Sequence, residues 1–288
     1  MPDPRLCHVP ALSPAGLHRM AYWEWGAHDN PRVLVCVHGL TRQGRDFDTL
    51  ARTLCGEYRV ICPDVVGRGE SDWLREPEHY GLPQYAADMV CLLARLGAAQ
   101  VDWVGTSMGG LIGLTLAAFP GSPIRRLVLN DVGPGLEWAS LERIATYVGE
   151  EMHFDSIEQG AAQLRSISAG FGPFSEAEWL ALSRPMFKPS AAGVRLHYDP
   201  AISLTFRTLT PQVVAENELF LWAAYESLTL PVLLLRGAES DLLSAATAER
   251  MGECGPRAPC VTLPGVGHAP MLDREPQLRH VLEFLRHP

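Results

Sequence analysis

The sequence predicts an α/β fold in which helices cover both faces of a mostly parallel sheet, interrupted by one helical insertion. Strand-like apolar runs alternate with helix-like runs in the first half of the chain, and this alternation returns near residue 229. Such alternation is typical of parallel sheets, because each parallel connection must cross over the sheet. The continuous apolar run at 33–39 also indicates a strand that is buried on both faces.

The elements expected in the core follow one another in a regular order. Strands are expected at 20–26, 33–39, 58–64, 101–107, 125–131, 231–237 and 259–265, and helices at 82–97, 108–119 and 275–287, with a short helix ending at 51–57. In the helix at 82–97, Tyr85, Met89 and Leu92 fall on one face, and Gly97 ends it.

The alternation is broken between residues 132 and 230, where helix signals occur without a buried strand. Asp155 stands three residues before Glu158 and Ser175 three residues before Glu178, which is the spacing of a capping box at a helix start. We therefore expect an α/β core formed by residues 1–133 and 229–288, and a helical cap formed by 134–228.

Composition and charge exclude several classes of function. The 288 residues carry a net charge of −9, which argues against a surface for nucleic acid or anionic membranes. No signal peptide is apparent, and no run approaches the roughly 18 apolar residues of a membrane span. The seven cysteines, an odd number without a C-x-x-C pair, indicate free thiols in a reducing cytoplasm and no metal site.

The stretch "GTSMG" places Ser107 between two glycines, where a strand is expected to turn into a helix. A turn this tight forces its middle residue into a strained backbone, and the flanking glycines keep side chains out of the crowded space. The serine hydroxyl is then lifted clear of the sheet at a helix N-terminus, which favours negative charge. The pattern predicts that Ser107 is a nucleophile.

A serine nucleophile needs a base and a carboxylate that orients the base. His268 follows the last expected strand, and Gly265 and Gly267 just before it let the backbone bend to aim the ring, so we expect His268 to be the base. For the acid we expect Asp241, in the loop after the strand at 231–237, with Glu239 bonding within that loop. Asp131, at the end of the strand at 125–131, remains the alternative.

Two backbone N–H groups are expected to stabilise the developing oxyanion. One belongs to Met108, the residue after the nucleophile, and the other to Leu40, after the strand at 33–39. His38, just before this turn, is interpreted as a structural residue that holds the loop.

These stretches together resemble the α/β-hydrolase family. The matching pieces are "HGLT" (38–41), "DVVGRGESD" (64–72), "GTSMGG" (105–110), "LRGAESDLL" (235–243) and "GVGHAP" (265–270), in the family's order. The resemblance implies an eight-stranded, mostly parallel sheet, a helical cap and no cofactor. Its second strand is usually antiparallel, which suits the hairpin-like sequence at 22–35. Serine at position 107 excludes the branches with an aspartate nucleophile, namely haloalkane dehalogenases and epoxide hydrolases.

We expect a serine hydrolase that cleaves small-molecule carboxylic esters with small or medium acyl groups. A carbon–carbon bond hydrolase of ring-fission diketo acids is the first alternative, and a slow ligand-binding member of the fold is the second. Arg42 and Arg68 are candidate carboxylate-binding residues, and Trp138 and Trp222 candidate pocket aromatics. The sequence does not indicate an oligomeric state.

Overall fold

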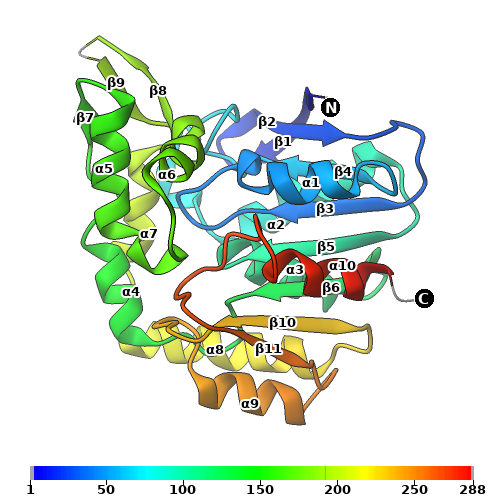
Figure 1. Cartoon of the computed structure of the whole chain (residues 1–288). Coiled ribbons are helices and arrows are strands. Elements are labelled where there is room, and N and C mark those ends of the chain that lie inside the picture. Colours follow the sequence, from blue (N-terminus) through cyan, green and yellow to red (C-terminus); the bar gives the residue numbers. More distant parts are fainter. Residues whose placement is uncertain (1–2, 192, 287–288) are drawn as a thin grey trace.

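The structure is a computed structural model that describes residues 3–191 and 193–286. Its main sheet has eight strands in the order β1-β2-β4-β3-β5-β6-β10-β11 (Figure 1). These strands are β1 (Arg5–Ser13), β2 (Gly16–Trp25), β3 (Val33–Val37), β4 (Arg59–Pro63), β5 (Val101–Thr106), β6 (Ile124–Asn130), β10 (Val232–Gly237) and β11 (Cys260–Leu263). From β4 to β11 neighbouring strands are parallel, whereas β2 is antiparallel to both β1 and β4. The predicted eight-stranded α/β fold is confirmed.

Helices cover both faces of this sheet because successive strand residues point in opposite directions. In β3, Val33 and Val35 belong to the larger hydrophobic cluster, while Leu34 and Cys36 belong to the smaller one on the other face. The larger cluster packs beneath α2 (Leu82–Leu96) and α3 (Met108–Ala117), and the smaller beneath α1 (Asp48–Leu54) and α10 (Gln277–Arg286). A further helix, α9 (Ala245–Glu253), joins β10 to β11.

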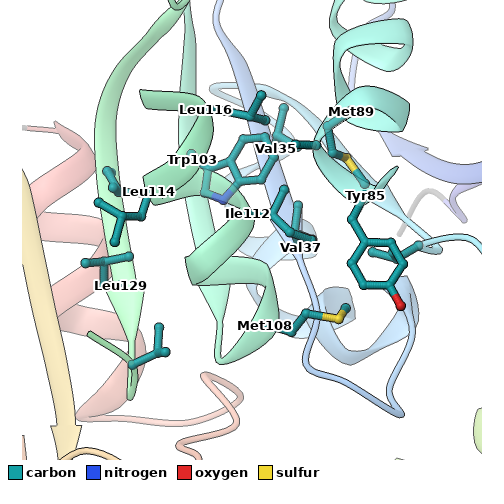
Figure 2. Close-up of a cluster of buried hydrophobic side chains, with 14 of the residues drawn as sticks. Val35, Val37, Tyr85, Met89, Trp103, Met108, Ile112, Leu114, Leu116 and Leu129 are labelled. Carbon is teal, nitrogen blue, oxygen red and sulfur yellow. The ribbon is translucent and has the colours of Figure 1, made fainter. Parts of the chain in front are cut away.

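The central helix α3 lies very close to the sheet. Met108, Ile112 and Leu116 follow one another at helical spacing and belong to the same hydrophobic cluster as Trp103, Val35 and Val37 of the sheet (Figure 2). A Cβ atom at Gly113 would overlap the Trp103 ring, so glycine is required for this approach. The Trp103 indole N–H donates to the carbonyl of Gly109 at 3.0 Å, which fixes the start of α3 against β5.

One strand of the main sheet was not expected from the sequence, and the hairpin at the N-terminus is placed differently. The strand β1 forms a hairpin with β2, and β2 pairs next with β4 rather than with β3. The hairpin expected at 22–35 is therefore wrong. The missed strand lies at the edge of the sheet, where Pro10 is tolerated because its missing N–H faces no neighbouring strand.

Most of the inserted segment between β6 and β10 lies beyond the carboxyl ends of the parallel strands, while its last helix runs beside the sheet and contacts α3 (Figure 1). Its helices are α4 (Trp138–Ala145), α5 (Ile157–Ile167), α6 (Glu176–Ser183), α7 (Leu204–Arg207) and α8 (Pro211–Glu226). It also contains a three-stranded antiparallel sheet of β7 (His153–Phe154), β8 (Phe187–Ser190) and β9 (Gly193–Leu196). The insertion is mainly helical, as expected, and the sequence did not indicate its small sheet because short, partly exposed strands give no buried apolar run.

The two predicted capping boxes have different outcomes. Ser175 and Glu178 form the predicted reciprocal cap of α6. At α5 the capping residue is Ser156 rather than Asp155, and its hydroxyl accepts a hydrogen bond from the Gln159 N–H. Across the described part of the chain, the helices are too short or too polar to cross a bilayer.

Candidate active site

Ser107 occupies a strained turn between β5 and α3. Its backbone angles are φ 51° and ψ −119°, a conformation that residues with a side chain rarely adopt. The flanking glycines are required by space, since a Cβ at Gly105 would overlap the Gly109 carbonyl and one at Gly109 would overlap the Val37 carbonyl. The turn therefore projects the Ser107 hydroxyl away from the sheet, as the motif predicts.

A hydrogen-bonded series of three side chains converges on this hydroxyl. His268, in the loop between β11 and α10, places its Nε2 atom 2.9 Å from the Ser107 Oγ. Its Nδ1 atom lies 2.7 Å from Oδ2 of Asp131, which follows β6. Asp131 is fully buried and also accepts hydrogen bonds from the Gly237 N–H and the Ser240 hydroxyl, each at 2.7 Å. This geometry allows His268 to accept the Ser107 proton while Asp131 orients the imidazole.

The prediction that Asp241 is the carboxylate beside His268 is wrong. The Asp241 side chain is half-exposed and accepts a hydrogen bond from Nε of Arg143 at 2.7 Å. The strands β6 and β10 are neighbours, so the loops that follow them meet at the same edge of the sheet. The loop after β10 contributes Ser240 as a support for Asp131, and Asp241 points away from His268 towards the inserted segment.

The turn after β3 approaches Ser107 closely. A Cβ atom at Gly39 would lie 3.7 Å from the Ser107 Cβ, which places the next residue, Leu40, beside the nucleophile. His38 holds this turn from within: its Nε2 accepts the Val65 N–H at 3.0 Å, so Nδ1 carries the proton and donates to the Gly39 carbonyl at 2.7 Å. Complete burial lowers the pKa of His38 to about 3, which keeps the ring neutral.

Arg68 lies behind this turn and not in a pocket, contrary to expectation. Its side chain is fully buried and donates to the carbonyls of Leu40 and Val66, each at 2.7 Å, while Nη2 contacts the Met108 sulfur at 3.6 Å. Within the described residues it forms no ion pair. A buried cation thus contacts both residues that were expected to supply N–H groups to the oxyanion.

Two cavities meet at Ser107, and Leu40 and Ile144 line both of them. The larger has a volume of about 360 Å³, and its walls are mainly apolar. They include Tyr85, Met108, Leu111, Val132, Leu136, Leu141, Phe206, Val214, Phe220 and Leu221. The smaller has a volume of about 100 Å³ and is more polar, with Arg42, Asp46, Arg143, Tyr147, Ser168 and Phe171 among its walls together with His268.

The tryptophans proposed for the pocket line neither cavity in the described part of the chain. Trp138 is half-buried against the hydrophobic core at the start of α4. The Trp222 indole N–H donates a hydrogen bond to Glu218. The guanidinium carbon of Arg250 lies over the same indole, 3.6 Å from the centroid of the Trp222 ring. The inserted segment instead contributes Tyr147 and Phe171 to the smaller cavity. The position of Tyr147 one turn after Arg143 in the sequence is a signal that both residues share one face.

Arg42 lines the smaller cavity, but its guanidinium already forms an ion pair with the carboxylate of Asp46. Its Nε and Nη2 atoms donate to the two oxygens of Asp46 at 2.7 and 2.6 Å. Both side chains are about one-tenth exposed, so this bidentate pair is shielded from water.

Comparisons with known proteins show the family of this chain. The sequence model of the alpha/beta hydrolase family matches residues 34–279. A 3-hydroxybutyrate-oligomer hydrolase from Cupriavidus necator is 53% identical over 272 residues, covering 93% of each chain. A 2-(acetamidomethylene)succinate hydrolase from Mesorhizobium japonicum is 30% identical, covering 82% of this chain and 81% of its own. The crystal structure of an alpha/beta hydrolase from Novosphingobium aromaticivorans, 36% identical, matches with a TM-score of 0.86 over 99% of both chains.

Proposed function

We propose that this chain, which belongs to the alpha/beta hydrolase family, is a serine hydrolase that cleaves carboxylic esters. The observation that carries the proposal is the hydrogen-bonded series from Ser107 through His268 to Asp131, at 2.9 and 2.7 Å. Nucleophile and base are within reach of proton transfer, and a buried carboxylate holds the base in the required tautomer.

The reaction follows from these positions. His268 takes the proton from Ser107 as Oγ attacks the ester carbonyl, and the N–H groups of Leu40 and Met108 stabilise the resulting oxyanion. Met108 is the first residue of α3, so its N–H has no acceptor within the helix. His268 then protonates the leaving alkoxide, and water hydrolyses the acyl-enzyme by the same route. No step in this sequence calls on a metal or an organic cofactor.

The substrate class is proposed from the relatives and from the cavities together. The Cupriavidus necator protein, with 53% identity along nearly the whole chain, is named for hydrolysis of 3-hydroxybutyrate oligomers. A mainly apolar cavity beside a smaller and more polar one suits a short aliphatic oligoester, whose repeating unit has an apolar methyl branch and polar ester groups. We propose short hydroxyalkanoate oligomers as the substrates, with residues 134–228 as a cap over the site and the cytoplasm as the location.

The first alternative, a carbon–carbon bond hydrolase, is not supported by the arginines that were expected to bind its substrate. It calls for an arginine that binds a substrate carboxylate, and the two candidates from the sequence do not provide it, because Arg42 is paired with Asp46 and Arg68 is buried behind Leu40. The second alternative, a slow ligand-binding member of the fold, is distinguished by turnover alone.

The test uses purified protein with the 3-hydroxybutyrate dimer, p-nitrophenyl butyrate and a fluorophosphonate probe. We expect the wild-type protein to hydrolyse both esters and to be labelled at one serine. Ser107→Ala should not be labelled, and its hydrolysis rate should fall to the residual rate that substrate binding and oxyanion stabilisation provide, about 10³–10⁴ over water. Stoichiometric labelling of Ser107 without ester turnover would support the ligand-binding alternative. Full turnover in Ser107→Ala would refute the proposed nucleophile.

A further inference from the structure

The two cavities fix the direction in which an ester lies across Ser107. His268 lines only the smaller cavity, and Met108 lines only the larger. Because His268 must return its proton to the leaving oxygen, the alcohol part of the ester occupies the smaller cavity. The acyl part then extends into the larger cavity, past the Met108 N–H.

The short helix α4 separates the two spaces and gives them different character. Leu141 faces the larger cavity, Ile144 borders both, and Arg143 with Tyr147 lines the smaller. The charged residue among the walls of the larger cavity is Glu218, whose carboxylate would repel an anion. A negatively charged end of a substrate is therefore favoured on the alcohol side and disfavoured on the acyl side.

Of the two arginines on the alcohol side, Arg143 is the one available to a ligand. Arg42 is held by both oxygens of Asp46 in a shielded pair. Arg143 meets Asp241 through Nε alone, and the two side chains are 43% and 47% exposed. Exposed ion pairs contribute little free energy, so a carboxylate entering the smaller cavity can compete with Asp241 for this guanidinium.

We propose that Arg143 binds a carboxylate on the alcohol part of the substrate, so that the preferred substrates are acyl esters of short hydroxy acids. The inference rests on the proposed ester hydrolysis and specifies its direction. Cleavage breaks the bond between the carbonyl carbon and the alcohol oxygen, forms the Ser107 acyl ester, and transfers the Ser107 proton through His268 to the departing hydroxy acid. On an oligomer, this arrangement releases the carboxyl-terminal unit first.

The test compares two dimers of 3-hydroxybutyrate that differ only at the end of the leaving unit, one a free carboxylate and one a primary amide of the same shape. We expect the wild-type protein to prefer the carboxylate. Arg143→Gln lowers kcat/KM for the carboxylate dimer by about tenfold to a hundredfold, the range for losing a charged hydrogen bond, and lowers it less than threefold for the amide. The matched control is Arg207→Gln, which removes an exposed cation at the end of α7 and should change neither value.

A second variant tests the competition directly and does not remove the arginine. Asp241→Asn frees Arg143 from a weak exposed pair, so KM for the carboxylate dimer should fall by about twofold to fivefold while KM for the amide stays constant. The inference is overturned if Arg143→Gln slows both dimers equally, or if Asp241→Asn leaves the carboxylate KM unchanged. It is also overturned if wild-type protein hydrolyses p-nitrophenyl butyrate but shows no preference for the carboxylate dimer. Failure to hydrolyse any of the three esters would instead refute the proposed function.

Discussion

The Asp131 carboxylate lies 2.7 Å from Nδ1 of His268 and is held there by two further hydrogen bonds, from the Gly237 N–H and the Ser240 hydroxyl. Three donors around one buried carboxylate leave it a single orientation. Two of these donors come from the end of β10 and the loop that follows, so β10 supports an acid that β6 supplies.

Replacement of Asp131 by Asn should therefore reduce kcat far more than the same replacement at Asp241. Asp131→Asn retains the shape but favours the wrong imidazole tautomer, and we expect kcat for p-nitrophenyl butyrate to fall by about 10⁴. Asp241→Asn, which alters an exposed partner of Arg143, should change it less than tenfold. Steady-state kinetics of both variants check the assignment, and the reverse order of effects would restore Asp241 as the acid.

The choice between these two aspartates shows where sequence reasoning reaches its limit. Seven strands of the main sheet, the Ser107 turn and the loop position of His268 follow from local patterns of apolar runs and glycines, whereas β1 and the strands of the inserted sheet do not. Asp131 and Asp241 both follow strands that end at the same sheet edge, so local pattern does not separate them. The difference depends on side-chain direction and burial, which only the packed loops determine.

The sequence places Arg68 near the site for the same reason, but the role of its side chain also depends on packing. Position 68 follows a strand end, which brings it to the correct edge of the sheet, but its side chain turns inward to the Leu40 carbonyl. The sequence of the inserted segment was less informative still. Its aromatic residues are spread along the whole segment, and their positions in the sequence do not distinguish the core-packed Trp138 and Trp222 from the cavity-lining Tyr147 and Phe171.

Loss of the Arg68 cation should reduce kcat more than it raises KM. The guanidinium orients the Leu40 turn and places positive charge behind the proposed oxyanion donors, so it acts mainly when negative charge develops. We expect Arg68→Met to lower kcat about tenfold to a hundredfold, and to weaken binding of an anionic trifluoromethyl ketone adduct by a similar factor.

Arg68→Lys is the matched variant, because it keeps the charge but not the two carbonyl contacts. Partial rescue of kcat by Lys would show that charge matters beyond loop position. Circular dichroism confirms that each variant folds. A folded Arg68→Met protein with unchanged kcat would contradict an electrostatic role.

Filling the larger cavity should shorten the acyl chains that the protein accepts. Leu136 lines this cavity and is only partly buried, so Leu136→Trp adds volume within it without displacing the deep core. Each buried methylene contributes about 0.8 kcal/mol, so a chain that loses the burial of two methylenes binds about tenfold more weakly. We therefore expect kcat/KM for p-nitrophenyl octanoate to fall at least about tenfold, whereas kcat/KM for the acetate ester should not change. Leu219→Trp, at an exposed position of α8 outside the cavity walls, is the control. An identical chain-length profile in Leu136→Trp and wild type would place the acyl group elsewhere.

His38 should make the folded protein less stable in mild acid. Its pKa is lowered from about 6.5 to about 3 by burial, so between these values the unfolded chain binds a proton that the native chain does not. The free energy of unfolding therefore falls as pH decreases from 6.5 towards 3, with a contribution of about 1.4 kcal/mol per pH unit from this residue. His38→Gln keeps an acceptor for the Val65 N–H but does not titrate, so urea unfolding from pH 4.5 to 7.5 should give a shallower slope. The exposed His8→Gln variant should retain the wild-type slope, and equal slopes in the wild-type and His38→Gln proteins would show that His38 is not the group responsible.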